Sequence, residues 1–150
     1  IRIIRMLIRI IRTIFMSDCI FCKIINQDIP GHVVYEDDQV MAFFDILPIS
    51  PGHTIVVPKK HVPDIEDLTD EEFRAMAAAV KKVGKAILSG LGVKGYSVFL
   101  DNKSAANQHV PHVHFHVVPR AEGDGLERWP QSGYSEGEAE HCLDKIKENL

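Results

Sequence analysis

Cysteine is scarce in this sequence: Cys19, Cys22 and Cys142 are the three cysteines among 150 residues. An odd and low cysteine count argues against a secreted fold held together by disulfides. We therefore expect a reducing compartment and a cytoplasmic protein. A membrane span is not expected from residues 1–15, because this hydrophobic stretch is too short and too charged to cross a bilayer.

Most of the chain has fewer basic than acidic residues. The formal net charge is −4, but residues 1–15 hold four arginines and no acidic residue, so residues 16–150 carry 13 basic and 21 acidic residues. Nonspecific binding to nucleic acid depends on lysine and arginine side chains that neutralise phosphates. We therefore expect no nucleic-acid partner, whereas a site for one small nucleotide stays compatible with this charge.

Residues 1–15 differ in composition from the rest. Their arginines recur every three or four residues, which aligns them on one helical face opposite isoleucine and leucine. Such a segment is typical of a mitochondrial presequence or of a helix on a membrane surface. The alternative is an extension outside the functional protein, which would then start at Met16. We predict a basic amphipathic extension at 1–15 and one domain with a C-terminal tail at 16–150; membrane contact or a mitochondrial location would depend on the extension.

The remaining chain shows signals of both strands and helices. The main helix is expected to begin at a capping box formed by Thr69 and Glu72, to bury an apolar stripe of helical period, and to end at Gly90. A short terminal helix is expected within 137–150. Residues 19–25 form a further apolar, strand-like stretch with two thiols. The predicted strands are residues 32–36, 40–44, 53–57, 96–100 and 112–118.

Three histidines alternate with apolar residues near the end of the domain. In a strand, His112, His114 and His116 share one face, while the valines and phenylalanine between them face the core. Imidazole titrates near neutral pH and can attack phosphorus or transfer a proton. The row therefore predicts covalent catalysis on a phosphate, in which one histidine attacks and its neighbours assist, with no catalytic metal.

The run from His112 to Val118 is H-φ-H-φ-H-φ-φ, where φ is apolar, and it resembles the motif of the histidine triad (HIT) family. The resemblance covers roughly residues 17–120 and is closest to the purine nucleoside phosphoramidase branch. It implies an α+β fold with a five-stranded antiparallel sheet and one main helix, and a homodimer. Further blocks resemble the family in the same order, at residues 19–25, 34–37, 42–46, 52–61 and 107–108.

The resemblance implies a role for individual residues. His114 is the expected nucleophile, His116 and His53 contact the phosphate and the leaving group, and His112 supports the nucleophile. Asp45 is expected to bind the ribose hydroxyls. Phe43 is expected to line the purine site, although its neighbour Phe44 could face the base instead. The other residues implied in nucleotide binding are Ile20, Phe21, Ile46, Asp101, Asn102, Asn107, Gln108, His109 and Val110.

Two residues of the expected phosphate loop depart from the family pattern. Asn107 replaces the usual glycine, and asparagine tolerates a positive φ better than most residues. His109 stands where a small or hydroxyl residue is common, so an additional imidazole is expected beside the phosphate and could change the preferred leaving group.

The pair Cys19 and Cys22 is compatible with zinc or with redox chemistry. A redox pair is expected within a βαβ unit, which this region lacks. Some members of the family combine such cysteines with two histidines, and His61 and His112 are the corresponding residues here. We therefore expect structural zinc at Cys19, Cys22, His61 and His112, in a closed site that leaves no position for substrate.

Three functions stay open at this point. The leading hypothesis is a purine nucleotide-binding hydrolase or transferase of the adenosine 5'-monophosphoramidase type, which acts at the α-phosphate of AMP or GMP phosphoramidates through a nucleotidyl-histidine. The second is a hydrolase of dinucleoside polyphosphates, with which the Pro119-Arg120 pair is compatible. The third is a nucleotide sensor or scaffold without catalysis.

Overall fold

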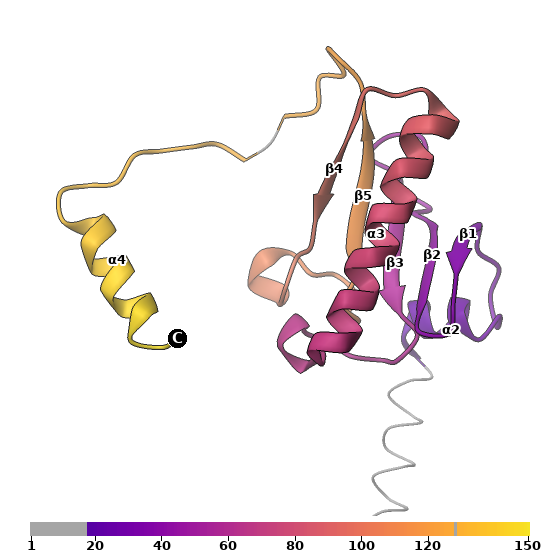
Figure 1. Cartoon of the computed structure of the whole chain (residues 1–150), viewed down its shortest axis with the longest axis horizontal. Coiled ribbons are helices and arrows are strands. Elements are labelled where there is room, and N and C mark those ends of the chain that lie inside the picture. The colour runs from indigo at the N-terminus through magenta and orange to yellow at the C-terminus, as the bar shows by residue number, and fades with distance from the viewer. Residues whose placement is uncertain (1–17, 128) are drawn as a thin grey trace, which may run out of the picture.

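The computed structural model describes residues 18–127 and 129–150, so the basic extension at 1–15 lies outside the described residues. Five antiparallel strands form one sheet in the order β1-β2-β3-β5-β4, which confirms the expected α+β architecture (Figure 1). The helices are α2 (Ile20–Ile25), α3 (Asp70–Leu91) and α4 (Glu138–Lys147), with short 3-10 turns η1 (Ile65–Asp67) and η2 (Ser104–Ala106). The strands are β1 (Val33–Glu36), β2 (Val40–Phe44), β3 (Thr54–Pro58), β4 (Gly95–Phe99) and β5 (Phe115–Arg120).

Helix α3 begins as its sequence predicts. The hydroxyl of Thr69 accepts a hydrogen bond from the backbone N–H of Glu72, and the Glu72 carboxylate accepts one from the backbone N–H of Thr69. The expected end at Gly90 is wrong. Gly90 lies inside the helix, and Gly92 is the residue with the left-handed backbone (φ 65°) that closes it.

Two other expectations need correction. Residues 19–25 are not strand-like, because Ile20–Ile25 form helix α2. The predicted strand at 112–118 begins later, so His112 and His114 precede β5. The reason lies in the backbone hydrogen bonds. The N–H of Val113 donates to the carbonyl of Val62, which lies outside the sheet, instead of to a neighbouring strand (2.7 Å).

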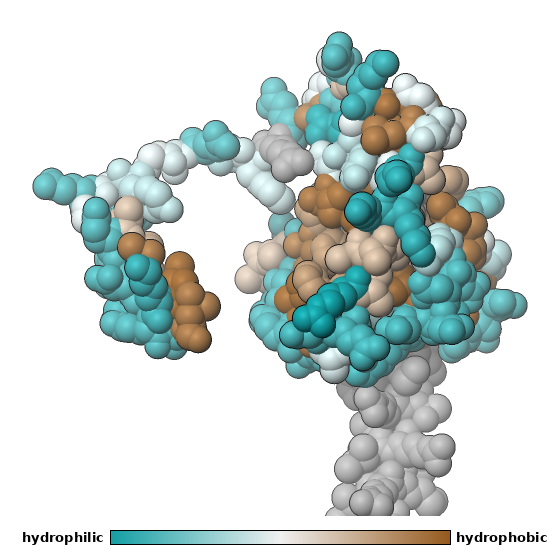
Figure 2. All heavy atoms as spheres, viewed as in Figure 1, coloured by the Kyte–Doolittle hydropathy of each residue, from teal (hydrophilic) through white to brown (hydrophobic). Residues whose placement is uncertain are grey.

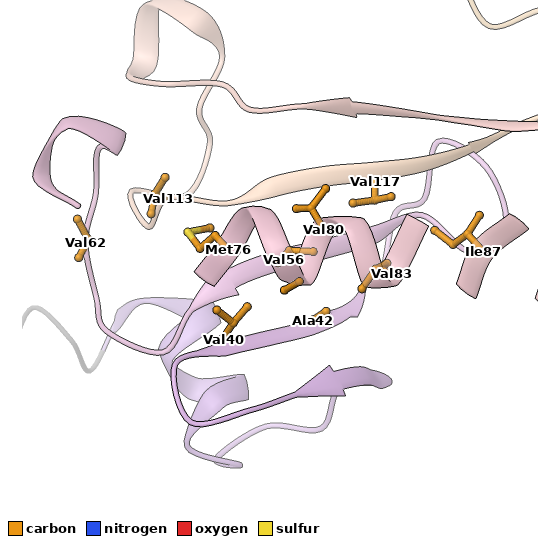
Figure 3. Packing of buried hydrophobic residues seen from close by; sticks show 11 residues of the cluster. Val40, Ala42, Val56, Val62, Met76, Val80, Val83, Ile87, Val113 and Val117 are labelled. Carbon is orange, nitrogen blue, oxygen red and sulfur yellow. The ribbon is translucent and has the colours of Figure 1, made fainter. Parts of the chain in front are cut away.

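A different helix packs against each face of the sheet. Helix α3 packs on one face, where Met76, Val80 and Val83 meet the inward valines of β2, β3 and β5 (Figure 3). Helix α2 covers part of the other face, over β2 and β3, through Phe21 and Ile24. The same face over β5 and β4 has no helix among the described residues. Strand β5, which contains His116, therefore lies at the edge of the part covered by α2.

The C-terminal tail leaves the sheet after β5 and ends in α4, which lies apart from the sheet (Figure 1). The apolar side chains of α4 gather on one side of that helix (Figure 2), and Leu143 and Ile146 are 50% and 61% exposed. None of the helices in the described ranges has both the length and the apolar character needed to cross a membrane.

Gly84 and Gly90 make a matched pair for testing how α3 packs. A Cβ at Gly84 would lie 2.3 Å from the ring of Tyr96, whereas nothing lies within 4 Å of a Cβ at Gly90. We expect Gly84→Ala to lower the free energy of unfolding by about 1–3 kcal/mol through overpacking. Gly90→Ala should raise it by about 0.5–1 kcal/mol, because alanine favours the helix. Urea unfolding measures both, and a stabilised Gly84→Ala variant would contradict this packing.

Candidate active site

The site begins with a row of neighbours across the sheet. Phe43 pairs with Ile55, Ile55 with His116, and His116 with Phe99, so these four side chains lie on the same face. Phe44, the alternative to Phe43, is on the opposite face and 41% exposed. The register therefore places Phe43, and not Phe44, on the face of the triad.

His114 lies beside this row, immediately before β5, and is 5% exposed. Its Nδ1 is 2.7 Å from the backbone carbonyl oxygen of His112. A carbonyl can only accept a hydrogen bond, so Nδ1 has the proton and the lone pair of the neutral ring is on Nε2. Burial lowers the pKa of His114 below its ordinary value. Nε2 is thus an unprotonated nitrogen at neutral pH.

His53 and His116 form a pair next to His114. The backbone N–H of Ile49 donates to Nδ1 of His53 (3.2 Å), so the proton of His53 is on Nε2. That nitrogen lies 2.9 Å from Nδ1 of His116 and donates to it, which leaves the proton of His116 on its Nε2. Burial lowers the pKa of both rings, that of His116 to about 4. Both rings are therefore neutral near pH 7, and each has a defined tautomer.

An aromatic wall and a carboxylate adjoin these imidazoles. The ring of Phe21 meets that of His114 edge-on at 5.0 Å and that of Phe43 at 5.5 Å. Asp45 accepts a hydrogen bond from the N–H of Leu47 and lies 3.7 Å from Nδ1 of His53. Ile20 and Ile46, also expected at the purine site, are exposed (42% and 82%). The chain thus brings apolar surface and one carboxylate to one side of His114.

The loop expected to hold the phosphate has the predicted backbone but different side-chain contacts. Asn107 adopts φ 67°, in the left-handed region. The side chain of Gln108 accepts from the N–H of Lys103 and donates to the carbonyl of Pro63, so it braces the loop itself.

The other residues expected in the phosphate loop differ in what they contact. The side chain of Asn102 is likewise engaged, with Ile65 and Glu66. The carbonyl of Val110 accepts from the N–H of His112. Asp101 and His109 both act electrostatically on His114. The side-chain amides of Asn102 and Gln108 therefore shape the loop, whereas Asp101 and His109 influence the pKa of His114.

Four metal-binding side chains converge on the other side of His112. The ligand atoms of Cys19, Cys22, His61 and His112 all lie within 4.8 Å of one another. Nδ1 of His112 is 3.5 Å and 3.6 Å from the two sulfurs, and Nδ1 of His61 is 3.3 Å from the sulfur of Cys22. Nitrogen and sulfur ligands of a tetrahedral zinc lie about 3.5 Å apart. The donor set and its spacing therefore fit zinc.

The surroundings of this cluster also suit a cation. Nε2 of His112 donates to the carbonyl of Pro58 (2.8 Å), which directs the lone pair of Nδ1 toward the sulfurs. Burial, and after it the neighbouring Cys19, raise the pKa of Cys22 to about 12. A pair of thiolates at this place therefore requires a positive charge between them.

Phe99 is a residue of the site that the sequence did not single out. Its ring stacks on that of His116, with centroids 4.5 Å apart and planes 15° from parallel. Only the pairing of β4 with β5 places it there, and no motif in the sequence signals that pairing.

Comparison with known proteins agrees with this geometry. The model of the HIT domain matches residues 26–123. An uncharacterized HIT-like protein of Methanocaldococcus jannaschii is 51% identical over 107 residues, which cover 71% of this chain and 82% of that protein. The adenosine 5'-monophosphoramidase hnt1 of Schizosaccharomyces pombe is 44% identical over 102 residues, 68% of this chain and 74% of that one.

Solved structures resemble most of the chain. A HIT family protein of Bacillus subtilis has a TM-score of 0.81 at 36% identity and covers 89% of this chain and 97% of its own. A zinc-bound histidine triad family protein of Mycobacterium smegmatis has a TM-score of 0.72 at 33% identity, covering 90% of this chain and 99% of its own.

The low pKa of His116 predicts how stability depends on pH. In the unfolded chain a histidine takes up its proton near pH 6.5, whereas folded His116 does so only near pH 4. The free energy of unfolding should therefore be highest above pH 6.5 and fall between pH 6.5 and 4, by at most about 3 kcal/mol for this residue. Urea unfolding across this range should show a shallower pH slope in His116→Gln. His141→Gln, on the exposed helix α4, is the control, and equal slopes in all three proteins would contradict the assignment.

Proposed function

This chain belongs to the HIT family of nucleotide hydrolases and transferases, and on that premise we propose that it hydrolyses the P–N bond of purine nucleoside 5'-phosphoramidates. The observation that supports this most directly is the tautomer of His114. A neutral ring whose proton is held by a backbone carbonyl presents a nucleophilic nitrogen without needing a separate base. The related Schizosaccharomyces pombe protein named as an adenosine 5'-monophosphoramidase supports the same reaction.

In the first step, the lone pair on Nε2 of His114 attacks the α-phosphorus. The P–N bond breaks, its electron pair stays with the nitrogen, and the departing amine takes up one proton from water. The hydrogen bonds from Ile49 to His53 and from His53 to His116 leave the proton of His116 on its Nε2. This N–H is available to donate a hydrogen bond to a phosphate oxygen. The product of this step is a nucleotidyl-His114.

In the second step, water attacks the same phosphorus. The P–N bond to His114 breaks, and its electron pair returns to Nε2. The proton that the attacking water loses neutralises the hydroxide that was left when the amine took its proton from water. The nucleoside monophosphate then leaves. In this scheme His112 acts as a positioning residue, because its carbonyl sets the tautomer of the nucleophile. The phenyl rings of Phe21 and Phe43 would hold the purine, and Asp45 the ribose.

His114→Ala tests both the nucleophile and the alternative of a noncatalytic sensor. We expect the rate on adenosine 5'-phosphoramidate to fall at least about a thousandfold, because no other nitrogen replaces Nε2. Binding of AMP, measured by calorimetry, should persist. His141→Ala, a histidine on α4, is the control with the wild-type rate. Turnover by His114→Ala at a near-normal rate would remove His114 from the chemistry, and a wild-type chain without turnover would favour the sensor.

We also propose that Cys19, Cys22, His61 and His112 bind one structural zinc ion. The support is the fit of donors, spacing and hydrogen bond at His112, together with the zinc-bound relative. Four protein ligands complete a tetrahedral zinc site, so the ion would link α2 to the segment that precedes β5. Its contribution in this proposal is to the position of His112 and to stability.

Cys19→Ser tests the zinc site, and Cys142→Ser on α4 is its control because Cys142 is exposed. We expect Cys19→Ser to lose zinc, as measured by elemental analysis, and to melt about 5–10 °C lower, because metal binding contributes to folding. The rate at low temperature should change less than the melting temperature. If zinc content and melting temperature match those of Cys142→Ser, the proposal is wrong.

A second copy of the chain is the protein partner that we propose. β4 is an edge strand whose Val98 is 37% exposed, and edge strands offer unpaired backbone groups to another chain. Ala77 and Ala78 add small exposed side chains on α3.

A further inference from the structure

Lys103 has a backbone conformation that side chains rarely adopt. It lies in the phosphate loop, residues 101–110, immediately before the 3-10 turn η2, with φ 73° and ψ 160°. This combination of φ and ψ is essentially restricted to glycine, because a Cβ atom collides there with neighbouring backbone atoms. Strain of this kind persists only where surrounding contacts hold it, and it gathers at functional sites. The side chain of Lys103 should therefore contribute something to the loop that a glycine would not supply.

The ammonium group of Lys103 reaches the segment that precedes helix α3. Its Nζ lies 3.1 Å from a carboxylate oxygen of Asp64 and 3.8 Å from one of Glu66. The hydrogen bond to Asp64 raises the pKa of Lys103, so the ammonium stays charged. A single exposed ion pair stabilises a protein little. Its importance here depends on which two segments it joins.

Three further hydrogen bonds join the phosphate loop to the same segment. The side-chain amide of Asn102 accepts from the N–H of Ile65 (2.9 Å) and donates to the carboxylate of Glu66 (2.7 Å). The side-chain amide of Gln108 donates to the carbonyl of Pro63 (2.7 Å). The loop is thus attached to the segment before α3 near both of its ends.

The carbonyl of Lys103 organises the rest of the loop. It accepts hydrogen bonds from the N–H groups of Ala106 (3.0 Å) and Gln108 (3.2 Å), which closes the turn. The chain then continues to His109 and Val110, whose N–H groups donate no hydrogen bond to another residue in the described ranges. Backbone N–H groups that a turn leaves free can bind an anion. The backbone of Lys103 therefore sets where these two donors lie.

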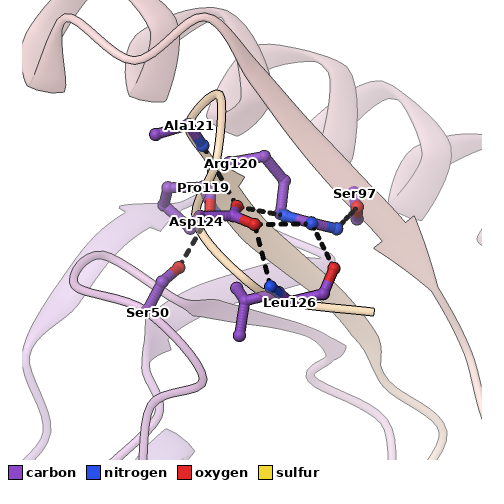
Figure 4. A network of polar contacts seen from close by, with 7 residues as sticks. All are labelled: Ser50, Ser97, Pro119, Arg120, Ala121, Asp124 and Leu126. Carbon is purple, nitrogen blue, oxygen red and sulfur yellow. Dashed lines mark hydrogen bonds and ion pairs between the residues drawn. The ribbon is translucent and has the colours of Figure 1, made fainter. Parts of the chain in front are cut away.

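Two basic side chains near the loop are already paired. Arg120 lines one cavity together with Asn107. Its guanidinium donates to both oxygens of Asp124 (2.6 and 2.9 Å) and to the carbonyl of Leu126 (2.6 Å) (Figure 4). The ammonium of Lys103 is paired as well, with Asp64. Neither cation is presented to a phosphate, which leaves this task to the N–H groups of the loop.

Resting on the proposed phosphoramidase function, we propose that Lys103 is a positioning residue that clamps the phosphate loop. Its ion pair with Asp64 holds the strained backbone, and this backbone presents the N–H groups of His109 and Val110 to the α-phosphate. The ammonium itself does not touch the substrate. A loop held in this way needs no reordering when the nucleotide binds. The clamp therefore contributes equally to binding of the ground state and of the transition state.

Lys103→Met and Asp64→Asn each break the ion pair in the full chain. We expect either variant to raise KM for adenosine 5'-phosphoramidate about two- to fivefold while kcat stays near the wild-type value, because uniform binding is lost. The double variant should match the single variants, since all three lack the same contact. Lys145→Met is the control. Lys145 is also 3.1 Å from its partner Glu148, and it is 61% exposed against 57% for Lys103.

A direct contact between Lys103 and the phosphate would give a different pattern. Asp64→Asn would then release the ammonium and lower KM, whereas Lys103→Met would raise it. Opposite signs in these two variants would overturn the clamp. Effects that multiply in the double variant would overturn it too, because the two side chains would then act independently.

The strained backbone is tested with two further substitutions of Lys103. Lys103→Gly and Lys103→Ala both remove the ammonium, but only alanine keeps a Cβ atom in the region restricted to glycine. We expect Lys103→Ala to melt about 2–5 °C below Lys103→Gly. A higher melting temperature for the alanine variant would contradict the strain.

Two measurements separate the clamp from the proposed function, because neither depends on turnover. In the protein without ligand, the bonded N–H groups of Ala106 and Gln108 should exchange with solvent about two- to fivefold faster in Lys103→Met than in Lys145→Met. Calorimetry should show AMP bound about two- to fivefold more weakly by Lys103→Met. If the wild-type chain binds AMP without cleaving the phosphoramidate, the proposed function fails and these measurements still decide on the clamp. Equal exchange and equal affinity in the two variants would overturn it, as would a wild-type chain that does not bind AMP.

Discussion

The hydrogen bond between Nδ1 of His114 and the carbonyl of His112 decides what this site is able to do. A buried neutral imidazole has one proton and two nitrogens, and without a partner either tautomer could form. The carbonyl accepts a hydrogen bond and never donates one, so Nδ1 keeps the proton and the lone pair is on Nε2. Burial acts in the same direction, because it lowers the pKa of the ring and keeps it uncharged. An imidazole nitrogen with a lone pair at neutral pH thus results from backbone geometry together with desolvation.

The same carbonyl connects His114 to the cluster of Cys19, Cys22, His61 and His112. His112 contributes its carbonyl to His114, its Nε2–H to Pro58 and its Nδ1 to the pair of cysteines. In our proposal, a zinc ion on Nδ1 would fix the residue whose backbone sets the tautomer of its neighbour. The ion would act on catalysis only through this position, which is how outer contacts tune a reacting group without touching the substrate.

The sheet face opposite α3 is divided into three parts. Helix α2 covers β2 and β3 and brings Phe21 to the edge of His114. The imidazoles occupy the middle. A cavity lies over β5 and β4, and a hydrogen bond from Arg120 to the carbonyl of Leu126 holds the segment that borders it. An antiparallel sheet makes this division natural, since one row of cross-strand neighbours runs from Phe43 through Ile55 and His116 to Phe99. In the proposed reaction, the purine and the phosphate follow this row.

Local pattern in the sequence was sufficient for the features that depend on neighbours along the chain. The alternation of histidine with apolar residues predicted which side chains share a face, and Val113, Phe115 and Val117 do pack against the core under α3. The capping box at Thr69 formed as expected, and Asn107 took the left-handed backbone that a glycine usually supplies. The four zinc candidates were identified by resemblance, and the structure brings them together. Only the tertiary structure decided that Phe43 and not Phe44 shares the triad face, that Phe99 stacks on His116, and that Gln108 and Arg120 are engaged within the fold. These outcomes depend on strand register and on contacts between residues far apart in the chain, which the periodicity of a single segment does not specify.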